Sequence, residues 1–292
     1  MAQNSKIEWT ETTWNPVTGC TKISAGCTHC YAERMARRLA GRFGYPEAPH
    51  HFDVTLRPER LGEPLRWRKP RTVFVCSMSD LFHEDVPFEF VAEIIDVIEA
   101  TPEHAYQILT KRPGRALEFT NWMRRENYDP SAGMMGFFDW PKNAWLGVTI
   151  EKPEYCYRSE DLRQIPAAVR FISFEPLLGS FADYPGVLDD IDWAIVGGES
   201  GPGARPMHPD WARSLRDQCQ AAGVPFFFKQ WGAWYPNDAR HPGFAEMYED
   251  GGDARHCLVG DMAFARVGKK RAGRLLDGRT WDKYPISSED RQ

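Results

Sequence analysis

Short apolar runs recur along the chain, each followed by a polar loop or an amphipathic stretch. The runs cover residues 72–78, 105–109, 145–150, 170–174, 193–196 and 225–229. They lack the polar–apolar alternation of a half-exposed strand, which favours parallel strands covered on both faces. Apolar residues at helical spacing predict helices over residues 31–42, 88–100, 114–125 and 209–222. In the first of these, Tyr31, Met35 and Leu39 share one face.

This succession of strands and helices predicts an α/β fold, either a parallel β/α barrel or a doubly wound sheet. We expect residues 1–232 to form this body, with a cysteine-bearing loop at 19–31. Beyond Gly232 the sequence is rich in Gly, Asp, Arg and aromatic residues with weak periodicity, so residues 233–292 are expected to be a C-terminal extension packed on the barrel. The Gly-, Pro- and aromatic-rich segment 127–143 is interpreted as a lid over the site or as a surface excursion.

Composition narrows the class of protein. The 292 residues are 42% hydrophobic and 26% charged, as is usual for a soluble globular protein. No apolar run approaches the roughly 20 residues of a membrane span, and the N-terminus lacks the pattern of a signal peptide, so we expect a cytoplasmic protein with no membrane partner. A net charge of −5 argues against a general binder of polyanions.

Polar residues follow the predicted strands directly. In a parallel β/α barrel the carboxyl ends of the strands converge at one rim, where sites are built. The alternative is that each strand end is polar simply because it reaches water. The residues at these positions are Ser77, Ser79, Asp80, Thr110, Lys111, Arg112, Thr149, Glu151, Glu175, Gly197, Gly198, Glu199, Ser200, Lys229 and Gln230.

Three cysteines are crowded into one short segment. Cys20, Cys27 and Cys30 form a C-x6-C-x2-C pattern between the predicted first strand and helix. An odd total of seven cysteines, three of them this close, is typical of metal or redox chemistry rather than of a disulfide framework. Three thiolates on one loop suit three irons of a cubane iron–sulfur cluster and leave the fourth iron open to another ligand.

Zinc is the alternative metal. A structural zinc site takes four ligands, so a fourth would have to join the three cysteines, and none of the candidates has the spacing of a zinc finger. The cysteines at positions 76, 156, 219 and 257 are interpreted as small core residues. The candidates for a fourth zinc ligand are His29, His83, Cys76 and the pair His256–Cys257.

Motifs along nearly the whole chain carry a resemblance. They are WNPVTGC with the three cysteines, SMSDLF, LTKRP, GVTIE, FISFEPLLG, VGGESG, FFFKQWG and GRLLDGRTWDKYP. Together they resemble a phage-associated three-cysteine-motif family without an assigned reaction, itself related to the radical S-adenosylmethionine (radical SAM) enzymes. The usual radical SAM motif is C-x3-C-x-aromatic-C. This chain departs from it by a longer first gap, with His29 at the aromatic position and Tyr31 one place after the last cysteine.

The resemblance implies a partial TIM-like barrel of the radical SAM type, in which Cys20, Cys27 and Cys30 hold a [4Fe–4S] cluster. S-adenosylmethionine would bind the open iron and be cleaved to a 5′-deoxyadenosyl radical that acts on a nucleotide or a nucleic-acid-related substrate. The expected cofactor contacts are Ser77, Ser79, Asp80, Thr149 and Glu151. The catalytic candidates are Glu175, Glu199 and Lys229.

Other functions stay open at the level of sequence. A non-catalytic module, stapled by zinc or by a cluster, would bind nucleic acid or a protein partner and use some of the eleven tryptophans for stacking. A cluster protein without the cofactor would serve as a sensor or scaffold. The glycine-rich segment 197–201 is interpreted as a phosphate loop or as a tight turn. A basic stretch that would contact a phosphate backbone, or else form a solvated tail, contains Arg266, Lys269, Lys270, Arg271, Arg274 and Arg279.

Overall fold

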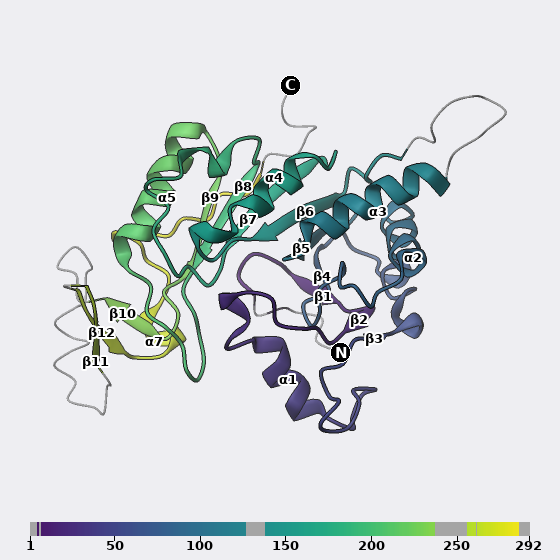
Figure 1. The fold of residues 1–292 in the computed structure, drawn as a ribbon, viewed down its shortest axis with the longest axis horizontal. Coiled ribbons are helices and arrows are strands. Elements are labelled where there is room, and N and C mark those ends of the chain that lie inside the picture. Colours follow the sequence, from purple (N-terminus) through teal and green to yellow (C-terminus); the bar gives the residue numbers. More distant parts are fainter. Residues whose placement is uncertain (1–4, 6, 127–137, 237–255, 261, 286–292) are drawn as a thin grey trace. The chain divides into compact units, whose positions relative to one another are not determined.

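The structure is a computed structural model that describes residues 1–292 except 1–4, 6, 127–137, 237–255, 261 and 286–292. The chain divides into two compact units, whose elements are labelled in Figure 1. The first unit contains Met1–Ile23, Cys30–Val148 and Tyr157–Arg170, and the second contains Ser24–His29, Thr149–Cys156 and Phe171–Gln292. The motif loop therefore contributes to both, with Cys20 and Cys30 in the first unit and Cys27 in the second.

Parallel strands form the centre of the first unit in the order β1, β4, β5 and β6. Their register places Thr72 of β4 opposite Ala105 of β5, and Tyr106 of β5 opposite Ala144 of β6. A short antiparallel pair, β2 and β3, follows β1. The bounds are β1 (Thr12–Trp14), β2 (Val17–Thr18), β3 (Thr55–Leu56), β4 (Thr72–Val75), β5 (Ala105–Thr110) and β6 (Ala144–Thr149).

The helices of the first unit bury their apolar faces. In α2, buried residues recur three or four positions apart, as in Val91, Ile94 and Ile98. In α1 the buried residues are Ala32 and Ala36, whereas Tyr31 is 58% exposed, so the expectation that Tyr31 belongs to the packed face is wrong. The bounds are α1 (Tyr31–Leu39), α2 (Phe88–Glu99), α3 (Pro113–Glu126) and α4 (Tyr157–Arg163), with single 3-10 turns η2 (Pro58–Arg60) and η3 (Pro64–Arg66).

The segment 127–143, interpreted from its composition as a lid or a surface excursion, lies mostly outside the described residues. Its last part is described and packs into the first unit. Phe138 and Trp140 are buried and lie 6.1 and 5.9 Å from the ring of Phe119 in α3. The indole of Trp140 also donates to the hydroxyl of Thr120 at 3.1 Å. This end of the segment is therefore fixed by aromatic packing on α3.

The second unit contains the parallel strands β7 (Val169–Phe174), β8 (Trp193–Gly197) and β9 (Phe226–Gln230) in that order, with α5 (Pro209–Ala222) between β8 and β9 in the chain. Local chemistry sets both ends of α5. Proline occupies the first helical position, where the backbone N–H that proline lacks would have no partner within the helix. Gly223 ends it at φ 70°, where its N–H reaches Cys219 and Gln220 carbonyls. The 3-10 turns are η1 (Ala25–Cys27), η4 (Pro153–Tyr155) and η5 (Pro185–Leu188).

The C-terminal residues add a small antiparallel sheet to the second unit, in the order β10, β12, β11. It consists of β10 (Trp234–Pro236), β11 (His256–Val259) and β12 (Met262–Arg266), followed by α7 (Lys269–Ala272). The chain then returns along β9, where Phe228 N–H donates to the Trp281 carbonyl at 2.9 Å and Trp231 N–H to the Gly273 carbonyl at 3.1 Å. The expected division of the chain at residue 232 stays a prediction.

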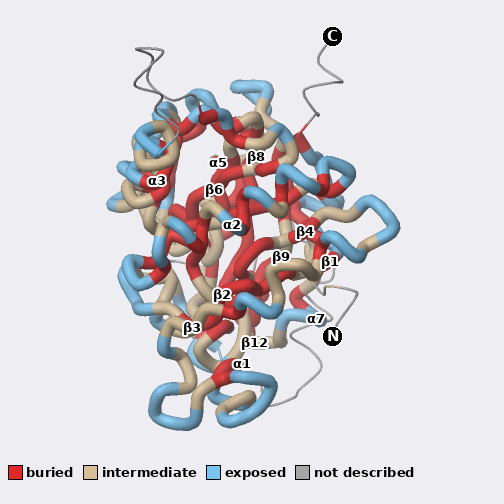
Figure 2. Tube along the Cα trace, turned by 90° about the vertical axis from the view of Figure 1, so that its right-hand side faces the viewer, coloured by how far each residue is buried: buried red, intermediate tan, exposed pale blue. Residues whose placement is uncertain are grey.

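Within each unit, neighbouring strands of the parallel sheet follow chain order, without the reversal that defines a doubly wound sheet. The predicted strands and helices match the observed ones to within three residues at each end. The predicted fold class, a partial TIM-like parallel β/α arrangement, is therefore confirmed. Figure 2 shows the buried residues along β4 and β8, and β8 is buried throughout. None of the helices in the described ranges combines the length and apolarity that a membrane span requires.

Candidate metal centre

The first cysteine of the motif lies beside the chain that follows β4. Gly19 forms a parallel bridge with Ser79, and its N–H donates to the Met78 carbonyl at 3.0 Å. Only glycine suits this position, because its φ is +88° and a Cβ there would lie 2.1 Å from the Asp53 carbonyl oxygen. Cys20 is therefore placed by its glycine neighbour at the carboxyl ends of β1 and β4.

The last cysteine of the motif sits at the start of α1. Cys30 occupies the position before the first helical residue, and it packs against the buried cluster that contains Ala36 and Met78. Since the Met78 carbonyl also accepts the Gly19 N–H bond, Cys20 and Cys30 are both tied to the same short segment after β4. Both cysteines are partly exposed and neither is in a disulfide.

Arg112, two residues beyond the end of β5, contacts the sulfur of Cys20. Its Nη1 donates to Cys20 Sγ at 3.6 Å and to Asp80 Oδ2 at 3.2 Å, and its Nε donates to Glu84 at 2.8 Å. The Arg112 side chain is only 9% exposed. Burial by itself lowers the pKa of Arg112, but Asp80 and the Cys20 thiolate raise the pKa above its ordinary value. A permanent positive charge thus lies beside the first cysteine.

The carboxylate of Asp80, an expected cofactor contact, is occupied by donors of the protein. Its Oδ1 accepts from the Thr110 hydroxyl at 2.7 Å and from the Phe82 N–H at 3.1 Å. Its Oδ2 accepts from the Lys111 N–H at 3.0 Å in addition to Arg112. Asp80 therefore links the end of β4 to the end of β5 and holds the guanidinium in place.

A second anchor of Arg112 passes through Thr21 to His83. Arg112 Nη2 donates to Thr21 Oγ1 at 2.8 Å, and His83 Nε2 lies 2.8 Å from the same oxygen. His83 Nδ1 accepts from the Asp85 N–H at 3.1 Å. Burial, followed by the charge of Arg112, lowers the pKa of His83, which keeps the ring neutral at pH 7. Both ring nitrogens of His83 are engaged, which disfavours it as a fourth zinc ligand.

The two serines expected to contact the cofactor join the ends of β1 and β4. Ser77 Oγ donates to Asn15 Oδ1 at 3.1 Å, and the same oxygen of Asn15 accepts the Met78 N–H at 3.0 Å. Ser79 Oγ donates to the Val17 carbonyl at 2.8 Å. The hydroxyls keep free lone pairs, but their protons are directed at the protein.

In the second unit, a buried carboxylate holds the part of the motif loop that carries Cys27. Glu151 is fully buried, and its Oε1 accepts from the Gly26 N–H at 2.9 Å and from the Ser24 hydroxyl. A Cβ on Gly26 would lie 2.5 Å from that oxygen and 3.2 Å from Pro176 Cδ, so the loop needs glycine there. Ser24 Oγ also lies 3.6 Å from Cys27 Sγ.

Two further side chains fix Ala25, the residue between these contacts. The Tyr155 hydroxyl accepts the Ala25 N–H at 3.1 Å, and Arg205 Nη2 donates to the Ala25 carbonyl at 2.9 Å. Arg205 is itself held by Glu199, to which it donates through Nε at 2.8 Å and Nη2 at 2.7 Å. Glu199, a catalytic candidate from the sequence, therefore orients an arginine that supports the motif loop.

The other two catalytic candidates lie at the ends of β7 and β9 and contact each other. Lys229 Nζ donates to Glu175 Oε2 at 3.2 Å, and Ser173 Oγ lies 3.4 Å from the same oxygen. Within the described residues, Glu175 Oε1 is buried without a hydrogen-bond partner. A Cβ on Gly197 would lie 2.3 Å from Glu175 Oε1, so the glycine at the end of β8 leaves space for this carboxylate. Thr149, the remaining cofactor candidate, is buried at the end of β6.

By their chemistry, the three motif cysteines are better candidates for metal-binding thiolates than the buried Cys76 and Cys219. Burial raises the pKa of Cys76 and of Cys219 to about 12, so these thiols stay protonated and are poor ligands, as expected for core residues. The same expectation is wrong for Cys156 and Cys257, which are only partly buried. The three motif cysteines are partly exposed and not in disulfides, and Cys20 accepts an N–H bond from the largely buried Arg112 side chain. In the described part of the chain, no group of three or more His, Cys, Asp and Glu side chains is arranged to hold a metal ion.

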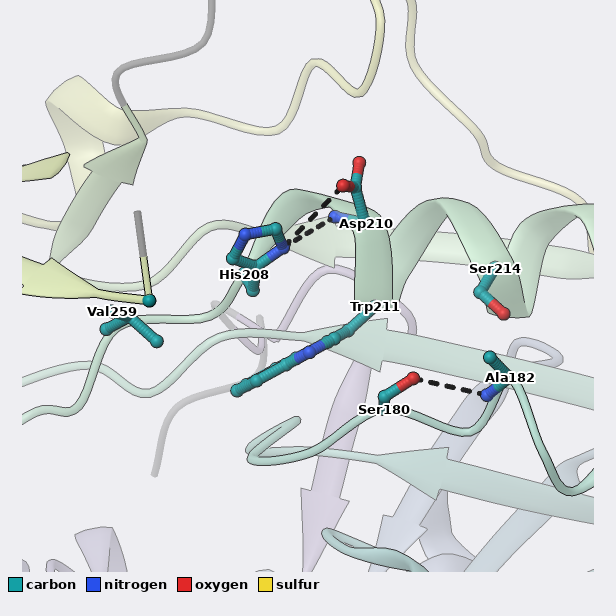
Figure 3. Close-up of a pocket in the computed structure, with 8 residues that line it drawn as sticks. Ser180, Ala182, His208, Asp210, Trp211, Ser214 and Val259 are labelled. Atoms are coloured by element: carbon teal, nitrogen blue, oxygen red, sulfur yellow. Dashed lines mark hydrogen bonds and ion pairs between the residues drawn. The ribbon is translucent and has the colours of Figure 1, made fainter. Parts of the chain in front are cut away.

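A pocket of about 540 Å³ lies elsewhere in the second unit, at the N-terminal end of α5 (Figure 3). Trp211 and His208 line it, and Val259, at the end of β11, lies across from them. His208 Nδ1 accepts the Asp210 N–H at 3.2 Å, as a cap of the helix. No predicted site residue lines this pocket, so it is separate from the residues at the strand ends.

Comparison with known proteins assigns the chain to a family without assigning a reaction. Residues 4–285 match the family described as "Protein of unknown function (DUF5131)", and the chain belongs to it. No curated protein matches the sequence. Among solved structures, it is similar to spore photoproduct lyase complexed with dinucleoside spore photoproduct, with a TM-score of 0.47, 10% identity, and coverage of 92% of this chain and 72% of that one. Two mutants of the same lyase, with the same coverage, have TM-scores of 0.46 and 0.45 at 10% and 12% identity.

Sequence reasoning found the strand-end residues but not their partners. It did not single out Asn15, Ser24, Tyr155 or Arg205 as site residues, although Asn15 stands inside the WNPVTGC motif. These residues act through contacts with segments distant in the sequence, such as Arg205 with Ala25, 180 positions apart. Local patterns carry no signal for such pairs.

Proposed function

We propose that the protein is an iron–sulfur enzyme of the radical SAM type that acts on a nucleotide or a nucleic-acid-related substrate. Cys20, Cys27 and Cys30 would hold a [4Fe–4S] cluster. The observation that carries the proposal is the contact between Cys20 Sγ and the buried guanidinium of Arg112 at 3.6 Å. A fixed cation beside a cysteine favours the thiolate, which is the form that binds metal.

Within each unit, hydrogen bonds from distant residues hold that unit's own part of the motif loop. Asp80 and Thr21 anchor the arginine beside Cys20, while Glu151 and Arg205 anchor the loop before Cys27. Ligands that are held in position lose less conformational entropy when a metal binds. Two of the candidate fourth ligands for a closed zinc site are disfavoured, because His83 is hydrogen-bonded through both ring nitrogens and burial raises the pKa of Cys76 to about 12.

When bound, the cluster and S-adenosylmethionine supply a one-electron reductive cleavage that yields a 5′-deoxyadenosyl radical. The contribution of the chain is to bind, orient and shield. Asp80 and Glu151, expected as cofactor contacts, act here by organising the loop and the arginine. Glu175 Oε1 remains as a buried acceptor at a strand end, and Lys229 beside it supplies a positive charge. This pair would orient a polar group of the cofactor or the substrate.

The nucleotide character of the substrate rests on the family resemblance. The exposed residues Lys269, Lys270 and Arg271 in α7 offer positive charge for a phosphate backbone, as the basic stretch predicts. A protein partner and the division of the chain at residue 232 are likewise parts of the proposal that rest on sequence alone.

Metal content tests the ligand assignment. We would reconstitute the wild type, Cys27→Ala and Cys257→Ala anaerobically and measure iron and acid-labile sulfide per chain. Cys257 is a partly exposed cysteine outside the motif and serves as the matched control. We expect about four irons in the wild type and the control and a large loss in Cys27→Ala. Equal iron and sulfide in all three proteins would remove Cys27 from the ligand set.

Electron paramagnetic resonance then tests the cofactor. The dithionite-reduced wild type should give a cluster spectrum that changes when S-adenosylmethionine is added, because the cofactor binds the open iron. A cluster that ignores the cofactor would favour a sensor or scaffold. Zinc without iron would favour the binding module.

A further inference from the structure

We propose that Arg112 is a positioning residue that raises the reduction potential of the cluster by donating an N–H bond to the sulfur of Cys20. This inference rests on the proposed function and adds a role that the sequence did not assign. The electron-transfer step it concerns is simple: one electron passes from a low-potential one-electron donor, dithionite in the assay, to the cluster, and no bond forms or breaks.

The geometry directs the charge of Arg112 at one ligand. Nη1 lies 3.6 Å from Cys20 Sγ, which is within hydrogen-bond distance for sulfur. The remaining nitrogens are held by Glu84 through Nε and by Thr21 through Nη2. Because Asp80, Glu84 and Thr21 together fix the guanidinium, the N–H that faces the sulfur cannot easily turn away.

Electrostatics then sets the sign of the effect. Adding an electron makes the cluster more negative, so a nearby cation and an N–H donor to sulfur stabilise the reduced form more than the oxidised form. Arg112 is 9% exposed, so water screens its charge weakly.

Two carboxylates near Arg112 oppose its charge but do not cancel its effect at the sulfur. Glu84 is 59% exposed and its charge is screened by water. Asp80 is buried, but its two oxygens also accept from Thr110, Phe82 and Lys111, so its negative charge is spread over several donors. The donor that reaches Cys20 is the guanidinium itself.

The experiment is a redox titration of the reconstituted protein, followed by the electron paramagnetic resonance signal of the reduced cluster. The proteins are the wild type, Arg112→Gln, Arg112→Lys and Lys111→Gln. Lys111→Gln is the matched control, because it removes one positive charge at the neighbouring position while the Lys111 backbone N–H that contacts Asp80 remains.

We expect a lower midpoint potential in Arg112→Gln, an intermediate value in Arg112→Lys, and an unchanged value in Lys111→Gln, at equal iron content. Equal potentials in the wild type and both Arg112 variants would overturn the inference. The inference would also be overturned if both Arg112 variants lost the cluster while Lys111→Gln kept it. Arg112 would then be needed to keep the cluster bound rather than to set its potential. A wild type without iron is a different outcome, because it would refute the proposed function itself.

Discussion

Replacing Gly26 by alanine should disturb the Cys27 side of the motif loop through a single methyl group. The new Cβ would lie 2.5 Å from Glu151 Oε1, 3.1 Å from its Cδ and 3.2 Å from Pro176 Cδ. The nearest atom belongs to a fully buried carboxylate that is bonded to Gly26 and Ser24, so it has little room to retreat. Either the loop or the carboxylate must move.

The structure sets the size of the effect. If Glu151 yields, the Gly26 hydrogen bond to a charged acceptor is lost, at a cost of about 1.5–3 kcal/mol. If the loop yields, the cost is the overpacking penalty of about 1–3 kcal/mol. These are alternatives rather than a sum, so the free energy of unfolding should fall by about 2 kcal/mol, which is roughly a 30-fold change in the ratio of folded to unfolded protein. Displacement of the loop next to Cys27 should also reduce iron retention.

Urea unfolding of the apoprotein and iron content after reconstitution are the two measurements. Gly62→Ala is the matched control, because the nearest atom to a Cβ at Gly62 is a Leu65 methyl carbon at 3.9 Å, an ordinary contact. The control should match the wild type in both measurements. A Gly26→Ala protein as stable and as rich in iron as Gly62→Ala would show that Glu151 does not constrain this loop.

Two further predictions concern the titration of Asp277 and of the cysteines. Burial raises the pKa of Asp277, but hydrogen bonds and charge from Arg213 and Arg216 lower it more, so it stands below the ordinary value of 3.8. The stabilisation is therefore complete above pH 3.8 and lost as the pH falls through the folded-state pKa. Asp277→Asn should lower the urea midpoint at pH 7, and an equally large difference at pH 2 would contradict this reasoning. Iodoacetamide at pH 8 should alkylate the motif cysteines of the native apoprotein but spare Cys76 and Cys219, whose pKa values of about 12 keep them protonated. Peptide mass spectrometry would identify the alkylated cysteines. Modification of Cys76 or Cys219 would contradict the prediction, because it would show that the buried core opens.

Asp80 and Glu151, the two carboxylates among the predicted cofactor contacts, show what a strand-end pattern can and cannot predict. The sequence places Asp80 and Glu151 directly after buried strands, and in the structure Glu151 lies two residues after β6 and Asp80 five residues after β4. It does not reveal where their oxygens point. In the structure Asp80 accepts from donors on β5 and the residues after it, and Glu151 accepts from the motif loop. A buried carboxylate pairs first with N–H and O–H donors of the protein, because unpaired buried polar groups are costly. A strand-end carboxylate therefore need not face a ligand.

What the sequence by itself determined is the local structure and the candidate chemistry. Buried runs without alternation specified the parallel strands, and the proline at the start of α5 together with Gly223 after it marked that helix at both ends. The spacing of Cys20, Cys27 and Cys30 predicted a metal site, which stays a prediction. These signals are local, because burial periodicity, helix ends and ligand spacing each depend on residues close together in the chain.

Only the tertiary structure decided which side chains meet. Arg112 and Cys20 are 92 positions apart, and Gly26 and Glu151 are 125 apart. The C-terminal antiparallel sheet was likewise missed, because its short strands have weak periodicity and are stabilised by pairing with one another. Strand order and register bring such segments together, and no propensity of a single segment encodes them. The residues that position the motif loop and place a positive charge beside Cys20 follow from the fold rather than from the motif.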